Sequence, residues 1–424
     1  MRIRELTIQN YRAFGEPQTF PFSPSFTAIA GINGRGKTSL LDGLALLASR
    51  ILPHISPARS GYRTLGPLDL HDGHGPLSLS MKINCAAIPI EFGVSLDEDA
   101  KAPKVTKLSP AVKKAARNIY GDPTRADDAA PLVVYFTTDR AGYRLPKKLP
   151  TAVPRGQAAA YAGALFNRTV NFRDFMARYH SAVVLQEEET RRNPNYLGDR
   201  AVGAISDALT TFLGGFRNLR VEQRPLRLLI DKDDQSFDIS QLSDGERSFL
   251  ALICDLGRRL ALANPELTNP LHGAGVVLID ELELHLHPKW QREVRDKLLA
   301  TFPNVQFIAT THSPFIIQSM NPGELINLDP DEFAEYSDKS IEDISENVMG
   351  VDLPQKSKRY QEMMKAAEEY FTLVRQPSPD RKLLASAESR LNELSVPFSD
   401  DPAFQALLKL ERQTKGREGD DASS

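Results

Sequence analysis

The chain has 424 residues, 41% of them hydrophobic and 25% charged, with a formal net charge of −3. This composition is typical of a globular protein, excludes a fibrous or wholly disordered chain, and allows one large domain or two to three smaller ones. The N-terminus does not resemble a signal peptide, and no apolar window approaches the roughly 18 residues of a membrane span. Two distant cysteines in apolar contexts, Cys85 and Cys254, predict buried free thiols and a cytoplasmic location.

Charge is unevenly distributed along the chain. Residues 101–155 hold 12 Lys/Arg against 4 Asp/Glu, a net charge of +8, whereas residues 329–424 hold 13 against 21, a net charge of −8. The basic segment is either a surface for nucleic acid or another acidic partner, or a solvated insertion. The acidic segment does not suit a polyanion.

The N-terminal half predicts a strand, loop and helix, then further strands and a helical stretch. Apolar runs and alternation predict strands at Ile3–Gln9, Gln18–Phe22, Phe26–Ala30, within Leu77–Ser95 and at Leu132–Phe136, and helices up to about Leu52 and within residues 158–216. No heptad pattern is sustained, so we expect no long coiled coil.

The C-terminal half predicts a hairpin, an apolar helix, two apolar strands and then acidic helices. These lie at Leu226–Ile230 with Ser236–Ile239, Phe249–Leu262, Gly275–Glu281, Val305–His312, Ser340–Met349, Ser357–Val374, Pro379–Leu394 and Pro402–Arg412. We expect an N-terminal lobe (1–100), an insertion and helical lobe (101–235), a second lobe (236–320), an acidic helical domain (321–414) and a disordered tail (415–424).

The segment Gly31–Ser39 fits the pattern Gly-x4-Gly-Lys-Thr between an apolar strand and an apolar helix. Glycines let the backbone curl so that its N–H groups face a phosphate. Lys37 supplies positive charge, and the Thr38 hydroxyl can ligate Mg²⁺. Because the strand and the helix are both present, the segment predicts a nucleotide-binding loop.

The segment Gln241–Arg247 lies at the start of the strongly apolar helix. Its backbone N–H groups and the helix dipole can hold an anion, with Ser243 and Gly245 contacting phosphate. Taken alone, the same residues fit an ordinary helix N-terminus, with Ser243 as the N-cap and Glu246 completing a capping box.

The strand from Gly275 ends in two carboxylates, Asp280 and Glu281. Asp280 suits a Mg²⁺ site, and Glu281 suits the orientation of an attacking water. About thirty residues on, a second apolar strand ends at His312, which can reach a γ-phosphate. A lone strand-end histidine is more often structural, but the preceding Asp-Glu pair favours the functional interpretation.

In order and spacing, these motifs resemble the ATP-binding-cassette ATPases of the SMC/RecF/OLD kind over residues 1–320. The resemblance implies an α/β fold, an ABC-type P-loop head with a mixed sheet, flanking helices, a short helical insertion and a small helical C-terminal appendage. It implies ATP and Mg²⁺ as ligands, with Glu281 and His312 catalytic and Thr38 and Asp280 at the metal. The nucleotide-binding residues it implies are Gly31, Asn33, Gly34, Arg35, Gly36, Lys37, Thr38, Ser39, Ser243, Gly245, Glu246 and Arg12.

The resemblance also implies pairing of heads. In that family the signature helix is too far from its own phosphate loop to meet the same nucleotide, so ATP is held between Walker A of one copy and the signature of another. We therefore expect a homodimer or higher homo-oligomer. Arg12 resembles the N-terminal basic residue near nucleotide, although an exposed hairpin arginine is an equal alternative.

Several positions depart from the family pattern. His287 stands where many cassettes have an aspartate. No glutamine loop is obvious either, and Thr138 or Asp139, just past the strand Leu132–Phe136, is the candidate to replace its glutamine. The pair His285 and His287 has metal-ligand letters but lacks a third ligand, and His71–His74 is better explained as a solvated turn.

The Glu-x-His-x-His-Pro form and the segment Tyr135–Arg140 are similar to the OLD and PtuA-like branch, which includes anti-phage ATPases of Septu and retron systems. This resemblance implies an ATP-hydrolysing sensor that controls a separate HNH-type nuclease, because residues 321–424 lack the strands of a Toprim nuclease. The alternative is a RecF-like ATPase of DNA repair that grips DNA through residues 101–155. The presence of Glu281 argues against a scaffold that holds ATP without hydrolysing it. The lack of a recognisable glutamine loop, near which a membrane partner docks in transporters, argues against membrane transport.

Overall fold

The computed structural model divides the chain into two compact units, Met1–Met349 and Gly350–Ser424. The residues that it describes are 1–58, 65–71, 75–85, 88–96, 104–105, 110, 113–114, 130–141, 148–150, 156–165, 172–193, 196, 198–329, 336, 339–350, 357–376 and 380–398. Most of the basic segment 101–155, the predicted helix Pro402–Arg412 and the predicted tail 415–424 lie outside these residues.

The centre of the first unit is a five-stranded sheet in the order β13-β3-β12-β11-β7, in which every pair is parallel. Its members are β3 (Phe26–Ala30), β7 (Leu132–Phe136), β11 (Gly275–Ile279), β12 (Val305–Thr310) and β13 (Leu325–Asn327). All residues of β3, β7, β11 and β12 are buried, as expected for parallel strands covered on both faces.

An antiparallel sheet and a long helix cover this centre. The sheet has the order β2-β1-β4-β5-β6 and comprises β1 (Arg2–Gln9), β2 (Gln18–Pro21), β4 (Leu77–Cys85), β5 (Ile88–Leu96) and β6 (Lys104–Val105). Helix α1 (Lys37–Ile55) contacts β4 of this sheet and β7, β11 and β12 of the parallel sheet. Leucines buried around the helix explain how it packs between two sheets.

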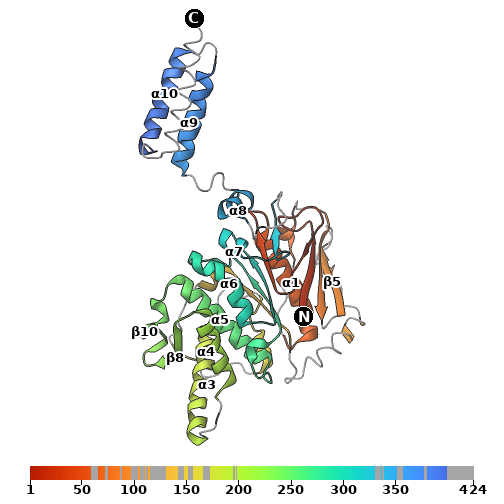
Figure 1. Cartoon of the computed structure of the whole chain (residues 1–424). Coiled ribbons are helices and arrows are strands. Elements are labelled where there is room, and N and C mark those ends of the chain that lie inside the picture. The colour runs from red at the N-terminus through yellow and green to blue at the C-terminus, as the bar shows by residue number, and fades with distance from the viewer. Residues whose placement is uncertain are drawn as a thin grey trace. The chain divides into compact units, whose positions relative to one another are not determined.

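The remaining part of the first unit is helical, with a small sheet of order β10-β9-β8 (Figure 1). The strands are β8 (Phe216–Gln223), β9 (Leu226–Lys232) and β10 (Gln235–Asp238), and the helices are α3 (Phe172–Arg192), α4 (Arg200–Phe212), α5 (Asp244–Ala263), α6 (Pro288–Thr301), α7 (Pro314–Gln318) and α8 (Ile341–Asn347). Strand β8 begins at the last residue of the stretch predicted as helical, and no element was predicted for the rest of it.

The short strand β13 lies inside the segment predicted as an acidic helical domain. It pairs with β3, and the first unit continues to Met349, so residues 321–349 belong to the first unit rather than to a separate domain. The segment Leu325–Leu328 is too short, is interrupted by Asn327, and lies too close to Gly323 and Pro330 to indicate a strand from the sequence. The predicted boundary at residue 321 therefore differs from the boundary in the structure.

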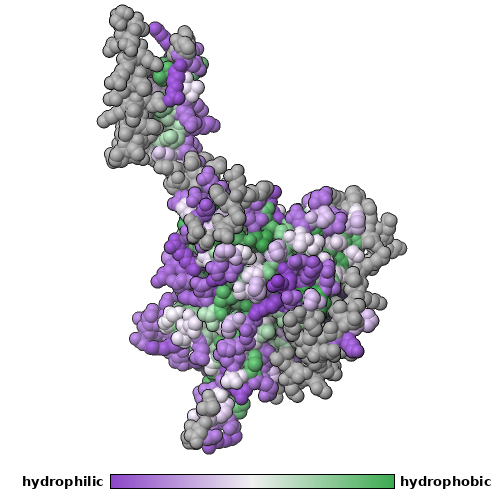
Figure 2. All heavy atoms as spheres, turned by 45° about the vertical axis from the view of Figure 1, so that its right-hand side comes forward, coloured by the Kyte–Doolittle hydropathy of each residue, from purple (hydrophilic) through white to green (hydrophobic). Residues whose placement is uncertain are grey.

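The second unit contains the helices α9 (Lys358–Val374) and α10 (Arg381–Ser395), which pack on each other through Met363, Ala367 and Leu391. In the first unit, hydrophilic residues cover most of the face drawn in Figure 2, and one large apolar cluster spans its sheets and helices. No helix in the described part of the chain combines the length and apolar character that a bilayer-spanning segment needs. The predicted α/β class is confirmed, with parallel and antiparallel strands in separate sheets.

Candidate functional site

The carboxyl ends of the five parallel strands meet at one edge of the sheet, where α/β proteins bind ligands. The phosphate loop follows β3, Asp280 and Glu281 follow β11, and His312 follows β12. Most of the predicted site residues line a single cavity of about 250 Å³ at this edge. Its lining is Ala13, Asn33, Gly34, Gly36, Lys37, Thr38, Ser39, Asp280, Glu281, Thr310 and His312.

The phosphate loop is already curled. Gly36 has a left-handed φ of 98°, and a Cβ atom there would lie 2.7 Å from the ring of Phe14, so only glycine fits. The ammonium of Lys37 donates to the carbonyl oxygens of Gly31 at 2.7 Å and Ile32 at 2.9 Å. Burial lowers the pKa of Lys37, and nearby carboxylates, Asp329 foremost, oppose that shift. The loop thus holds its lysine inside the curl.

The residues at the predicted metal site face each other. The Thr38 hydroxyl lies 3.3 and 3.2 Å from the two carboxylate oxygens of Asp280, and Thr310 donates a 2.7 Å hydrogen bond to the same carboxylate. A hydroxyl and a carboxylate are hard oxygen donors, which Mg²⁺ prefers. The residues present therefore fit the ion that the fold class implies.

Glu281 is held in an unusual backbone conformation at the end of β11. Its φ is 48°, in the left-handed region that a glutamate rarely adopts. Its N–H donates to the Thr310 hydroxyl at 2.7 Å, and its carbonyl oxygen accepts from Arg140 at 2.5 Å. Arg140 also donates to the carbonyl oxygen of Asp280 at 2.5 Å. One guanidinium thus fixes the backbone of both acidic residues.

Arg140 is almost completely buried, with 2% of its surface exposed. Burial lowers its pKa to about 10, and the carboxylates of Glu283, Asp280 and Glu281 oppose the shift. At neutral pH the side chain is therefore a buried cation beside the acidic strand end. It lies in the 3₁₀ turn Thr138–Ala141, directly after β7. The guesses Thr138 and Asp139 lie in the same turn but do not line the cavity.

His312 is fixed through its backbone, because its N–H donates to a carboxylate oxygen of Glu283. Burial, and next the charge of Lys37, lower the pKa of His312, so its ring is neutral at pH 7. The other carboxylate oxygen of Glu283 is buried and has no hydrogen-bond partner among the described residues. Glu283 is thus a further carboxylate beside the predicted catalytic pair.

The predicted signature lies outside the cavity lining. Ser243 caps α5 by accepting from the Glu246 N–H at 3.3 Å, and Glu246 accepts from the Ser243 N–H at 3.0 Å, which is the capping box considered from the sequence. Glu246 also pairs with Lys232 at 2.6 Å. A Cβ atom on Gly245 would lie 2.4 Å from the carbonyl oxygen of His285, so the start of α5 packs directly on the loop after Glu281.

Two predicted nucleotide contacts have other partners in the structure. Arg12 pairs with Asp42 at 2.5 Å and with Asp69 at 2.9 Å, and it does not line the cavity. Arg35 pairs with Asp329 at 2.5 Å. Both arginines therefore act on carboxylates of their own chain in this structure.

Two of the histidines considered as metal ligands, His71 and His287, have structural contacts. His287 caps α6 by accepting from the Lys289 N–H at 3.3 Å, and His71 lies 2.5 Å from the carbonyl oxygen of Arg12. Residues 72–74 lie outside the described residues. Among the residues that are described, no three His, Cys, Asp or Glu side chains cluster as a metal site.

Sequence reasoning missed Arg140, Glu283, Thr310 and Asp329. Each of them contacts a backbone or hydroxyl group of a distant segment, which a local motif cannot reveal. Arg140 and Glu283 lie in segments that carried the family resemblance, but neither was given a role at the site. Thr310 is the last residue of a buried parallel strand.

Two family models match the chain. "AAA domain, putative AbiEii toxin, Type IV TA system" matches residues 139–318, and "AAA domain" matches residues 5–98. Among solved structures, "SMC head domain from Thermotoga maritima" aligns with 77% of this chain and 94% of its own, at 16% identity and a TM-score of 0.40.

Curated relatives are similar over different lengths. "Retron Ec83 probable ATPase" of Escherichia coli is 47% identical over 125 residues, 30% of this chain and 23% of that protein. "Retron Vc95 probable ATPase" of Vibrio cholerae is 26% identical over 377 residues, 77% of this chain and 73% of that protein. "Septu protein PtuA" of Bacillus mycoides is 31% identical over 162 residues, 37% of this chain and 22% of that protein.

The parallel sheet, the phosphate loop and the order of the motifs define an α/β P-loop head of the kind that ATPases have. Within that class it is related to the PtuA and retron ATPases. The chain spans less than a quarter of the length of two of the three relatives described, and 73% of the third.

Proposed function

We propose that the chain binds ATP with Mg²⁺ at the edge of the parallel sheet and hydrolyses it. The observation that carries this proposal is the convergence of the loop lysine, Thr38, the acidic pair and His312 on one cavity. The relatives named as probable ATPases support it.

Each residue has a role that follows from its position. The curled loop offers backbone N–H groups and the Lys37 charge to the phosphates. Thr38 and Asp280 would hold Mg²⁺, which neutralises phosphate charge when bound. Glu281 is positioned to orient and deprotonate a water, and the neutral ring of His312 to hydrogen-bond to the γ-phosphate.

The complete site requires a second copy of the chain. Ser243, Gly245 and Glu246 do not line the cavity of their own subunit, which supports a signature that serves the partner's nucleotide. ATP would then stabilise contact between heads, and hydrolysis would release it.

The biological role that we propose is a sensor and regulatory subunit of a bacterial anti-phage system. The relation to retron ATPases and PtuA supports this role. A separate nuclease, of the HNH type that the PtuA resemblance implies, would be the effector under its control. The alternative is a DNA-binding ATPase of repair, supported by the net charge of +8 in residues 101–155.

Phosphate release from ATP by the purified chain, compared with Lys37→Ala, tests the enzymatic proposal. We expect turnover by the wild-type protein and loss of it in the variant. Phage challenge of cells that express the chain with and without an HNH-type nuclease as the proposed partner tests the defence role. Tight, strongly salt-dependent binding to duplex DNA would favour the repair alternative instead.

A further inference from the structure

Asp329 follows β13 and contacts the phosphate loop from outside the predicted motifs. Its carboxylate accepts a 2.6 Å hydrogen bond from the Ile32 N–H and pairs with Arg35 at 2.5 Å. Only 10% of the Asp329 side chain is exposed, whereas half of Arg35 is. The phosphate loop is therefore bound, by a hydrogen bond and an ion pair, to a largely buried carboxylate nearly 300 residues away in the sequence.

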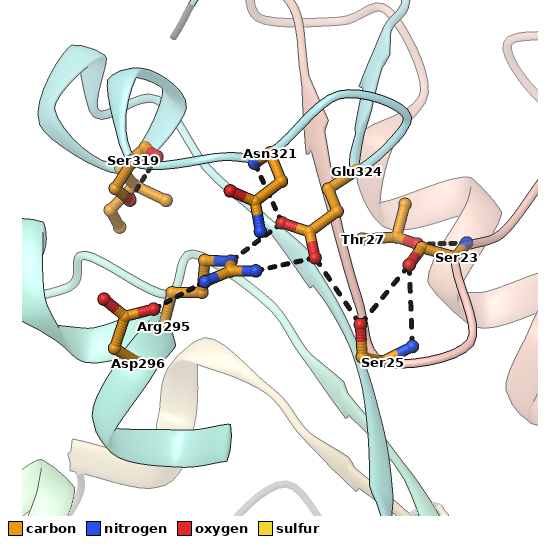
Figure 3. A network of polar contacts seen from close by, with 9 residues as sticks. Ser23, Ser25, Thr27, Arg295, Asp296, Ser319, Asn321 and Glu324 are labelled. Carbon is orange, nitrogen blue, oxygen red and sulfur yellow. Dashed lines mark hydrogen bonds and ion pairs between the residues drawn. The ribbon is translucent and has the colours of Figure 1, made fainter. Parts of the chain in front are cut away.

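A buried ion pair between Arg295 and Glu324 stabilises the start of strand β13. The guanidinium of Arg295 donates to both carboxylate oxygens of Glu324, at 2.7 and 2.8 Å. Figure 3 shows these side chains facing each other, with Ser25 and the backbone of Asn321 contacting the same carboxylate. The carbonyl oxygen of Glu324 also accepts from the Ala28 N–H at 2.7 Å. The pair ties α6, β3 and the turn before β13 together.

The register of β13 then brings Asp329 to the loop. Asn327 pairs with Ala30, the last residue of β3, and the Leu328 N–H donates to the Ala30 carbonyl oxygen at 3.0 Å. A Cβ atom on Gly31 would lie 3.1 Å from an Asp329 carboxylate oxygen and 3.2 Å from Leu328. Such close backbone approach is possible because residue 31 is glycine.

Both backbone polar groups of Ile32 consequently have a hydrogen-bond partner. Asp329 accepts its N–H, and Lys37 donates to its carbonyl oxygen at 2.9 Å. A loop that is ordered before its ligand arrives does not lose that conformational freedom on binding. The charge of Asp329 is balanced by Arg35, which limits its repulsion of phosphate.

We propose that Asp329 is a positioning residue of the nucleotide site, which holds the first turn of the phosphate loop in its binding conformation and keeps Arg35 on the loop. This inference rests on the proposed ATP binding. It assigns to Arg35 a role through Asp329 rather than a direct contact with nucleotide.

The first test is independent of nucleotide. Hydrogen exchange of the loop segment containing Ile32, measured without nucleotide, compares the wild-type protein with Asp329→Ala. We expect the Ile32 amide to exchange at least about tenfold faster in the variant, because it loses its acceptor. Unchanged protection would overturn the proposal whether or not the chain binds ATP.

The second test measures the dissociation constant for a fluorescent ADP and turnover at saturating ATP. We expect Asp329→Ala to raise the dissociation constant at least about tenfold. This change corresponds to the binding free energy that the loss of one charge-assisted hydrogen bond removes. Saturated turnover should change far less. Asp329→Asn keeps an acceptor oxygen, so its dissociation constant should lie between those of the wild-type protein and Asp329→Ala. Asp234→Asn removes an aspartate paired with Arg217 in the small sheet and should stay within about twofold.

Unchanged binding by Asp329→Ala would overturn the proposal, since the contact would then contribute nothing to affinity. Tighter binding would also overturn it, since the carboxylate would then only repel phosphate. Failure of the wild-type protein to bind nucleotide, with a protected Ile32 amide, would reject the proposed function and leave the loop contact established. Combining Arg35→Ala with Asp329→Ala should weaken binding no further than Asp329→Ala alone. An additional loss would assign Arg35 to the nucleotide directly.

Discussion

The guanidinium of Arg140 donates a 2.5 Å hydrogen bond to the carbonyl oxygen of Glu281, whose φ of 48° places it in the left-handed region. The same guanidinium binds the carbonyl oxygen of Asp280. A strained backbone at a functional site persists only where its surroundings hold it. Arg140 and the Thr310 hydroxyl hold Glu281 in place, together with the Leu284 N–H, which donates to the Glu281 carbonyl oxygen at 3.0 Å.

Arg140→Lys should lower turnover while leaving nucleotide affinity nearly unchanged. Lysine keeps the charge but cannot donate to two carbonyl oxygens in a fixed fork. We expect saturated turnover to fall at least about tenfold, since small displacements of a catalytic group are costly, and the dissociation constant to stay within about threefold. Arg259→Lys is the matched control, because Arg259 is also buried and donates to the carbonyl oxygens of Ala160 and Ala162. Equal effects of the two on turnover would argue against a role for Arg140 at Glu281.

Glu281→Gln should separate binding from hydrolysis. The amide cannot accept a proton from water, so we expect phosphate release to fall at least about a hundredfold. ATP binding should persist and the ATP-bound dimer should live longer. Stopped-flow phosphate detection and light scattering measure the two effects. Unchanged phosphate release would remove Glu281 from its assigned role.

His312 should make stability depend on pH below neutrality. Burial lowers its pKa from 6.5 in the folded chain, so the unfolded chain binds this proton more tightly. The stabilisation is complete above pH 6.5 and is lost as the pH falls from 6.5 toward the lowered value. Urea unfolding should show a smaller loss over this window in His312→Gln than in the wild-type protein. An identical pH dependence would contradict the burial of a neutral ring.

Gly245→Ala and Gly203→Ala should act in opposite directions. A methyl group at position 245 would meet the His285 carbonyl oxygen at 2.4 Å, and we expect a loss of about 1–3 kcal/mol of unfolding free energy with reduced turnover. Gly203 is exposed within α4 and has nothing within 4 Å of an added Cβ, so alanine there should stabilise by up to about 1 kcal/mol. Denaturant unfolding measures both. A stable, fully active Gly245→Ala protein would show that this close contact is dispensable.

Fully buried parallel strands were the most predictable elements. The predicted bounds Phe26–Ala30 and Leu132–Phe136 agree with β3 and β7, because continuous apolar runs between loop residues leave little ambiguity. Strand β8 carries the exposed Arg217 and the partly buried Arg220 and follows α4 after a short turn, so its sequence lacks the regular alternation that predicts a strand. Strand β13 has only three residues and depends on pairing with β3.

The site was predictable where its residues are neighbours in sequence. The loop Gly31–Ser39 and the pair Asp280 and Glu281 carry their chemistry in a contiguous pattern. Arg140, Glu283 and Asp329 act on backbone N–H and carbonyl groups of other segments. Arg140 and Glu283 lie in segments that carried the family resemblance, but no local pattern reveals their contacts, and Asp329 lies in none of the motifs. Arg12 and Arg35 were assigned to nucleotide from the family resemblance. Their carboxylate partners become visible only in the folded chain.

Complementation between two inactive variants tests the central claim most directly, namely that two copies of the chain complete each nucleotide site. Lys37→Ala disables the loop, and Ser243→Arg blocks the signature. Each variant alone should be inactive. An equal mixture should recover about a quarter of wild-type turnover, since half of the dimers are mixed and each of these has one intact site. A mixture as inactive as its components, with mixed dimers demonstrated by tagged pull-down, would contradict the account.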